Sequence, residues 1–321
     1  MNLPQLRYLP IRLASIKPER EIPFDLFLRD GEHYVLFRRA RQMLTRGMID
    51  KYVDRGIGDL YIDPRHKKEL AEFFEECLVT EFVDPLMPLD RKAALLMDAS
   101  RSIMDSIFED PTAPKVLRRA RTVVDHTIDF VSLGRDAVSS LTQLCSHEYQ
   151  TYVHCLQVSI YAVAIGNQMR LSREFLACLG EGAVLHDLGK TAVASKVLTK
   201  VGELTVGEWV EMKRHPTKGL ELLAQNEAID ERTRSAISGH HERLDGSGYP
   251  GGLTRDNIAL PARIVAVADV YDALTTEFPF RPAHTWEGAL KVLQEEAKAG
   301  LDADVVRELS VVIGTGRRKS K

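Results

Sequence analysis

The segment 186–190 reads HDLGK, and the segment 240–250 reads HHERLDGSGYP. The first of them follows a stretch with the apolar spacing of a buried helix, which Ser172 is placed to cap and Gly189 to end. A buried carboxylate beside a histidine is costly unless it has a partner, and a metal ion removes that cost. These two segments therefore decide the interpretation of the second half of the chain.

Two adjacent histidines on one helix diverge by about 100°. His240 and His241 are therefore expected to bind two different metal ions, or one metal ion and a substrate phosphate. His154 shares a predicted helix face with apolar residues, and His215 precedes Pro216. Taken alone, each of these histidines fits a packing role as well as a ligand role.

A predicted helix over 261–275 begins with a favourable proline and carries Asp269 and Asp272 on an otherwise apolar face. Together the candidates offer four or five histidine and two aspartate ligands, from the set His154, His186, Asp187, His215, His240, His241 and Asp269. Mixed imidazole and carboxylate ligation suits iron, manganese or zinc, and the lack of a cysteine ligand argues against a structural zinc site. A bridging aspartate with histidines on either side suits two metal ions about 3.5–4 Å apart, which activate a hydroxide and clamp the oxygens at phosphorus. Metal-assisted hydrolysis is the leading interpretation.

The 321 residues favour two domains, and the composition is that of an ordinary globular protein. The net charge of -3 gives no sign of binding a nucleic-acid polymer. Four scattered cysteines without a CxxC pair indicate reduced thiols. We find no signal peptide and no apolar run long enough to span a membrane, so a cytoplasmic location is expected.

The first part of the chain has an α/β pattern, and the rest is mainly α. We expect a small α/β regulatory or sensor-like domain over 1–84, a helical linker over 85–147 and a helical domain over 148–321. Strands are predicted over 24–29, 33–37 and 59–62, and helices over 45–55, 64–77, 91–109 and 115–147. Either core packing or a dimer seam explains the apolar stripes of the long helices, which leaves a homodimer open.

The second half of the chain resembles the HD-GYP branch of the HD phosphohydrolases. The matching segments are HDLGK (186–190), LTK (198–200), ELT (203–205), MKRHP (212–216), HHERLDGSGYP (240–250) and ADVYDALT (268–275). The resemblance covers about 150–282 and does not extend to the N-terminal region.

This resemblance implies an all-helical domain with a two- or three-metal centre, commonly iron with manganese as the alternative, that hydrolyses cyclic di-GMP to pGpG or GMP. The seven residues above would be the metal ligands, with Asp187 bridging. Asp187 and Lys190 would be the catalytic residues, and Lys190 would stabilise charge at the scissile phosphate. The expected substrate contacts are Lys190, Asp272, Arg281 and Tyr249. In the family the loop around Tyr249 is also proposed to dock diguanylate cyclase (GGDEF) domains.

Two positions depart from the family pattern. Gln150 stands where members with three metal ions have a carboxylate, which predicts two ions here. Phe278 replaces an arginine that reaches the ligand phosphate or base, although Arg281 is retained. Two alternatives to a cyclic di-GMP phosphodiesterase therefore stay open. One is a phosphodiesterase for another cyclic dinucleotide or a nucleotide monophosphate, and the other is a binding or cyclase-interacting module with little turnover.

Overall fold

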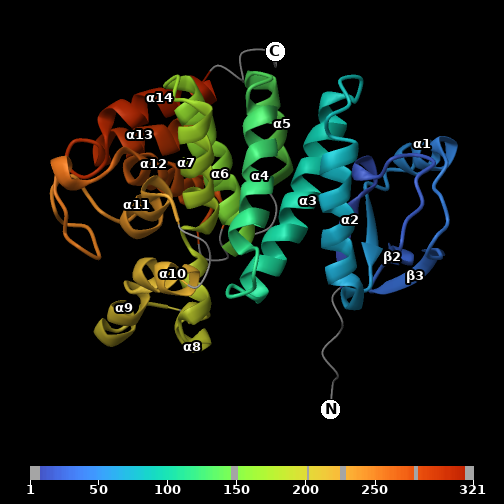
Figure 1. The fold of residues 1–321 in the computed structure, drawn as a ribbon, viewed down its shortest axis with the longest axis horizontal. Helices are drawn as coiled ribbons and strands as arrows, with labels where there is room; N and C mark the ends of the chain where they lie inside the picture. Colours follow the sequence, from blue (N-terminus) through green and yellow to red (C-terminus); the bar gives the residue numbers. More distant parts are fainter. Residues whose placement is uncertain (1–7, 146–150, 201, 225–228, 278–280, 315–321) are drawn as a thin grey trace. The chain divides into compact units, whose positions relative to one another are not determined.

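The computed structural model describes residues 8–145, 151–200, 202–224, 229–277 and 281–314. The chain divides into two compact units, Met1–Ser106 and Ile107–Lys321, and each is described by itself (Figure 1). The first contains a small sheet with helices, and the described part of the second is helical. The predicted fold class is confirmed.

The first unit is built around a four-stranded antiparallel sheet with the strand order β1-β4-β2-β3. The strands are β1 (Leu9–Arg12), β2 (Leu26–Asp30), β3 (His33–Arg38) and β4 (Asp59–Ile62). A hairpin joins β2 to β3, and Gly31 in its turn has φ 59°, a conformation that glycine adopts without strain. The sequence did not predict β1, whose four residues include Pro10.

Three helices complete this part of the chain, namely α1 (Arg46–Val53), α2 (Lys67–Thr80) and α3 (Leu89–Glu109). Helix α2 buries Phe73 and Phe74, and Phe73 packs edge-on against Phe24. In α3, Asp98 is buried and accepts hydrogen bonds from the backbone and side chain of Arg12. The charge of a buried carboxylate is thus compensated by its partner on β1.

The helices of the second unit begin with α4 (Val116–Val131), α5 (Arg135–Cys145), α6 (Thr151–Gln168), α7 (Arg173–Leu185), α8 (Ser195–Leu198) and α9 (Val206–Met212). They continue with α10 (His215–Leu223), α11 (Glu231–Gly239), α12 (Leu260–Thr275), α13 (Trp286–Glu296) and α14 (Ala303–Gly314). A short 3-10 helix, η3 (Leu188–Ala192), follows α7. The single helix predicted over 115–147 is wrong, because the chain turns at Gly134, which has φ 117°, between α4 and α5.

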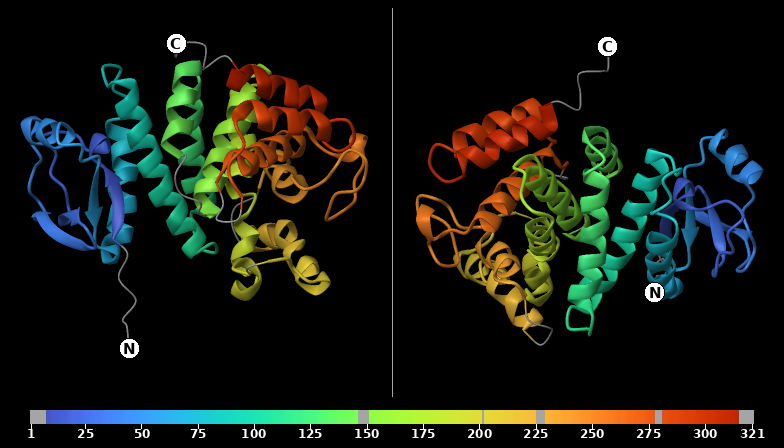
Figure 2. Two further views of the ribbon diagram at one scale, coloured as in Figure 1. Left: turned by 180° about the vertical axis from the view of Figure 1, so that it is seen from behind. Right: turned by 45° about the horizontal axis from the view of Figure 1, so that its top comes forward.

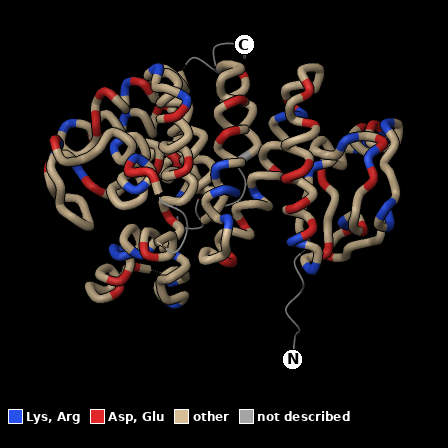
Figure 3. Tube along the Cα trace, in the orientation of Figure 1, with Lys and Arg blue, Asp and Glu red and all other residues tan. Residues whose placement is uncertain are grey.

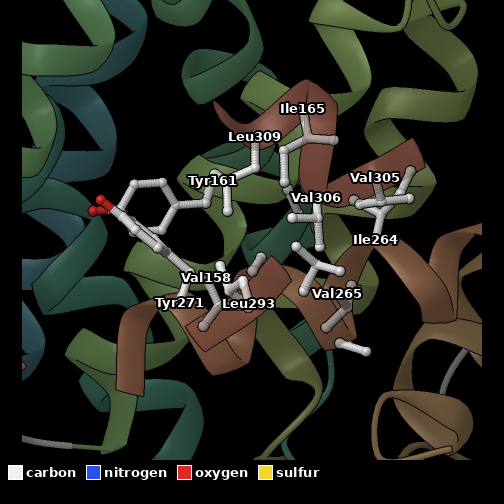
Figure 4. Packing of buried hydrophobic residues seen from close by; sticks show 14 of the residues in the cluster. Val158, Tyr161, Ile165, Ile264, Val265, Tyr271, Leu293, Val305, Val306 and Leu309 are labelled. Carbon is white, nitrogen blue, oxygen red and sulfur yellow. The ribbon is translucent and has the colours of Figure 1, made fainter. Parts of the chain in front are cut away.

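Helix α6 lies at the centre of this bundle and packs against α4, α7, α12 and α14 (Figure 2). Its residues from Val153 to Gly166 are all buried, as expected of a helix surrounded by others. Val158, Tyr161 and Ile165 join the core with residues of α12 and α14 (Figure 4). The helix that carries His154 is therefore held on several sides.

Among the residues that the structure describes, no helix is both long and apolar enough to cross a membrane.

Candidate metal centre

The seven candidate ligands come from five helices or their ends. His154 lies on α6, His186 caps the end of α7, and Asp187 follows it directly. His215 begins α10, His240 and His241 follow the end of α11, and Asp269 lies on α12. The carbonyl ends of α7 and α11 thus meet at the site, and helix C-termini favour bound cations.

A first group consists of His215, His240 and His241, each of which offers one ring nitrogen within 4.8 Å of the others. The Nε2 atoms of His215 and His240 lie 3.2 Å apart. Two ligands of one ion, each about 2.1 Å from it, lie about 3 Å apart. The expectation that His240 and His241 lie on one helix is wrong, because α11 ends at Gly239 and both histidines follow it.

A second group consists of His154, His186 and Asp269, again with one ligand atom each within 4.8 Å. Nε2 of His154 lies 3.1 Å from Oδ1 of Asp269. On its other side, Nδ1 of His154 lies 2.6 Å from Oδ2 of Asp272. This arrangement corresponds to the carboxylate–histidine–metal order found at protein metal sites.

Asp187 lies between the two groups. Its Oδ1 is 3.3 Å from Nε2 of His215 in the first group, and its Oδ2 is 3.5 Å from Nε2 of His186 in the second. The ammonium of Lys190 donates to Oδ2 at 2.5 Å. One carboxylate thus has an oxygen toward each group, as a bridging ligand requires.

Backbone carbonyls set the tautomers of three histidines. Nδ1 of His186 faces the Ala183 oxygen at 2.7 Å, and His215 and His240 make the same contact with the carbonyl three residues before them, at 2.8 Å each. A carbonyl oxygen only accepts, so Nδ1 carries the proton. In the neutral ring Nε2 then presents a lone pair to the centre of the site, as a metal ligand must.

Two buried atoms test whether these residues fit a metal ion. Nε2 of His186 and Oδ1 of Asp187 are both fully shielded from solvent and have no hydrogen-bond partner. Buried polar atoms of native proteins are nearly always paired, so such atoms call for an unrecorded partner. Imidazole and carboxylate donors suit divalent transition metals, and the residues present fit that group.

Burial and charge shift the pKa values in the direction that ligation needs. Burial lowers the pKa of His186, His215 and His240, and lowers that of His241 to about 3. Burial alone would raise the pKa of Asp187, but Lys190 and the surrounding histidines hold it well below its usual value. Four histidines are thus held neutral beside an ionised carboxylate.

His154 is the exception among the histidines. Burial opposes its charge, but hydrogen bonds to Asp269 and Asp272 raise its pKa well above the usual value. Without a metal ion its imidazolium therefore shares its two protons with these carboxylates. Binding of a metal ion at Nε2 would displace one proton, which is the usual linkage of metal binding to pH.

Two residues near the ligands have roles that the sequence did not predict. The thiol of Cys155 is buried and forms a third group with His186 and Asp187. Gly189 approaches α10 so closely that a Cβ atom would lie 1.9 Å from the carbonyl oxygen of His215. Gly189 lies inside η3 rather than in a left-handed helix stop, so its predicted role as a stop is wrong and its small size is what matters.

The loop 245–254 is held against the site by Glu242. This buried carboxylate accepts the backbone N–H groups of Gly251 at 2.6 Å and Leu253 at 2.8 Å. The ring of Tyr249 stacks on that of His241, with centroids 4.6 Å apart. The loop thereby brings an aromatic face to the first histidine group.

The other predicted substrate contacts lie differently. Asp272 is buried behind His154 rather than open to a ligand. The guanidinium of Arg281 donates to the carbonyl of Ala273 in α12. Gln150 and Phe278, on which the expected metal count and ligand affinity rest, lie outside the described residues.

We compared the chain with known protein families, curated proteins and solved structures. The family model described as the HD domain matches residues 128–305. The cyclic di-GMP phosphodiesterase PA4108 of Pseudomonas aeruginosa is 32% identical over 227 residues, which are 70% of this chain and 54% of that protein. The cyclic di-GMP phosphodiesterase response regulator RpfG of Xanthomonas campestris is 47% identical over 139 residues, 43% of this chain and 36% of that protein.

Two further relatives are informative. The 3'3'-cGAMP-specific phosphodiesterase 3 of Vibrio cholerae is 34% identical over 151 residues, 47% of this chain and 33% of that protein. Bd1817, an HDG"Y"P protein of Bdellovibrio bacteriovorus, has a solved structure that matches with a TM-score of 0.69 at 19% identity, over 96% of this chain and all of that one. This likeness concerns the fold. The chain spans about half or less of the length of the three enzymes that it matches by sequence.

Proposed function

Because this chain belongs to the HD domain family and, by its sequence signature, to the HD-GYP branch, we propose that it is a metal-dependent phosphodiesterase that hydrolyses cyclic di-GMP to pGpG or GMP. The observation that carries the proposal is the position of Asp187, with one oxygen toward each of two ligand groups. Relatives that share between 32% and 47% identity are named cyclic di-GMP phosphodiesterases.

The HD domain implies a dinuclear metal centre, and the ligand groups provide two positions for it. We infer that His215, His240 and His241 hold one ion and that His154, His186 and Asp269 hold the other. Iron is the first choice and manganese the alternative, because both accept imidazole and carboxylate ligands. Two bound divalent ions would supply Lewis acidity and lower the pKa of water at the site.

The chain's own residues then have separate tasks. Asp187 keeps the two positions at a fixed separation, and its ionised state provides the negative charge that two cations require. Lys190, half-buried beside it, adds positive charge where the reacting phosphate would lie. Asp272 holds Nδ1 of His154, so we assign it a positioning role in place of the expected substrate contact.

We propose that the Tyr249 ring contacts a guanine, since aromatic rings stack on bases. Arg281 remains a proposed substrate contact, and in the structure it would first have to leave the Ala273 carbonyl. The exposed residues 251–254 of the loop support its proposed use as a docking surface for a diguanylate cyclase domain. We also propose that the protein forms a homodimer. The proposed domains are an α/β domain over 1–84, a helical linker over 85–147 and the phosphohydrolase domain over 148–321.

A second substrate is favoured by one observation. Three relatives are named 3'3'-cGAMP-specific phosphodiesterases, and they share 26% to 34% identity with this chain. Cyclic di-GMP and 3'3'-cGAMP have the same phosphate arrangement and differ in one base, so the metal centre alone does not distinguish them.

Buried free thiols at Cys77, Cys155 and Cys178 support the proposed cytoplasmic location.

The test is to purify the protein without oxygen, measure bound metal and follow each cyclic dinucleotide by chromatography. We expect faster loss of cyclic di-GMP than of 3'3'-cGAMP, and no product from the His186→Ala/Asp187→Ala variant. If 3'3'-cGAMP is lost faster, then 3'3'-cGAMP replaces cyclic di-GMP as the proposed substrate. Tight binding without product from metal-loaded protein would replace the enzyme with a binding module.

A further inference from the structure

We propose that Lys213 is the cation that pairs with the second, non-reacting phosphate of a cyclic dinucleotide and thereby favours substrates with two phosphates. This inference rests on the proposed function, because it assigns a further substrate contact in the same site. Lys213 was not among the site residues expected from the sequence.

The backbone of Lys213 is tied to the first histidine group. Lys213 follows α9 directly and precedes His215 by two residues. The carbonyl of Met212, the residue before it, accepts the Nδ1 hydrogen bond of His215 at 2.8 Å. The base of this side chain is therefore fixed relative to the site, while the exposed side chain keeps its freedom to move.

The tip of Lys213 reaches the loop that borders the site. Its Nζ lies 5.4 Å from the centroid of the Tyr249 ring, and that ring stacks on His241. Water reaches the exposed side chain of Lys213, and an ammonium group in contact with water is held only weakly by an aromatic ring. A phosphate oxygen forms a stronger, charge-assisted hydrogen bond, so an arriving phosphate would draw Lys213 from the ring.

The positive charge of Lys213 is left without a compensating acid. Helix α9 carries two acids and no basic residue, and Lys213 and Arg214 follow it (Figure 3). These acids are engaged elsewhere. Glu208 pairs with Lys200, and Glu211 accepts the backbone N–H of Ala194 at 2.9 Å. Lys213 forms no ion pair with any residue that the structure describes.

The other two candidate cations, Lys190 and Arg281, already donate hydrogen bonds to other groups. Lys190 donates to Asp187 at the junction of the two ligand groups, where the reacting phosphate would lie. The guanidinium of Arg281 donates to the Ala273 carbonyl. A cyclic dinucleotide carries two negative phosphates, and the second needs a cation away from the metal positions. Lys213 is placed for that phosphate.

A simpler role would be that Lys213 only steadies the Tyr249 loop through its ring contact. The two roles differ in how the effect depends on the substrate. A steadying role affects every phosphodiester alike, whereas a contact with a second phosphate affects only substrates that have one. A charge-preserving change to arginine would also retain the phosphate contact.

The experiment compares cyclic di-GMP with bis(4-nitrophenyl) phosphate, a diester with a single phosphate. Steady-state kinetics are measured for wild type, Lys213→Gln, Lys213→Arg and the control Lys298→Gln, which removes one exposed lysine elsewhere. For Lys213→Gln we expect the ratio of kcat/KM between the two substrates to fall about tenfold through a higher KM for cyclic di-GMP. Lys213→Arg should restore most of that ratio, and Lys298→Gln should match wild type.

An equal change with both substrates, no change with either, or no recovery in Lys213→Arg would overturn the assignment. Failure of the proposed function looks different, because wild type would then leave cyclic di-GMP intact. In that case calorimetry of cyclic di-GMP binding decides the question for Lys213. A dissociation constant at least several-fold higher in Lys213→Gln supports the contact, and an equal or undetectable binding signal in both proteins overturns it.

Discussion

Nδ1 of His154 lies 2.6 Å from Oδ2 of Asp272, although 118 residues separate them in the chain. The contact fixes the imidazole so that Nε2 faces Asp269 and the second ligand group. Burial raises the pKa of Asp272, and His154 opposes that effect. Asp272 is thus a positioning residue for a ligand.

Asp272→Asn should weaken metal binding at the second position. Its amide can donate to Nδ1 and so favour the tautomer that protonates Nε2, and loss of such a partner typically lowers metal affinity or activity by about 10- to 100-fold. Metal titration followed by calorimetry checks this, with the exposed Asp256→Asn as the matched control. An affinity within about twofold of wild type would contradict the positioning role.

Gly189→Ala should destabilise the second unit and displace His215. The new methyl group would lie 1.9 Å from the His215 carbonyl oxygen and 2.5 Å from the Gly219 nitrogen, both of which are backbone atoms. Overpacking of this kind costs about 3 kcal/mol or more. Chemical denaturation and metal content are the measurements.

The control for that change is Gly207→Ala in α9, where nothing lies within 4 Å of the added methyl group. There alanine should be neutral or stabilise by up to about 1 kcal/mol, because it favours helix more than glycine does. If the two alanine variants have the same stability, the close approach of η3 and α10 is not what requires Gly189.

Glu242→Gln should loosen the loop that carries Tyr249. The amide keeps one oxygen for the two N–H groups of Gly251 and Leu253 and turns an NH2 group toward the other. A buried donor left unpaired costs about 1–3 kcal/mol. Limited proteolysis within 245–254 should accelerate and KM for cyclic di-GMP should rise, whereas the exposed Glu231→Gln should behave as wild type. Unchanged proteolysis would show that the loop is held by other contacts.

The metal-depleted protein should lose stability on acidification. Burial lowers the pKa of four of the five histidines in the site, and that of His241 to about 3, so the unfolded chain takes up protons first. Their stabilising contribution is present above about pH 6.5 and is lost as the pH falls through about 6.5 toward 3. His154 acts oppositely, because its raised pKa gives stability that is lost as the pH rises.

Denaturant midpoints between about pH 7.5 and about pH 5 measure this slope, and His241→Gln should make it shallower. A slope that is unchanged in His241→Gln would mean that this histidine is not held neutral by burial.

The candidate ligand set was predictable from the sequence because HDLGK and HHERLDGSGYP combine ligand-type residues with buried-helix patterns. The structure brings six of the seven predicted ligands into two groups and places Asp187 between them. Helices α1, α2, α3, α7 and α12 and three of the four strands were predicted as well, since local periodicity indicates them. These elements and motifs can be predicted because they depend on residues that are close together in the sequence.

What the sequence did not reveal depends on contacts between distant segments. The role of Asp272 depends on α12 packing against α6, and the need for Gly189 depends on η3 meeting α10. The turn at Gly134 was missed because the apolar spacing continues across it. The placement of His240 and His241 on one helix was wrong because α11 ends at Gly239.

The most direct test of the account is turnover of cyclic di-GMP measured against the number of metal ions per chain. Metal-depleted protein is loaded anaerobically in steps, and product is followed by chromatography at each step. Since Asp187 joins two ligand groups, we predict that activity appears only as the second equivalent binds and that Asp187→Asn abolishes it. Full activity with one ion per chain, or none with two, would contradict the account.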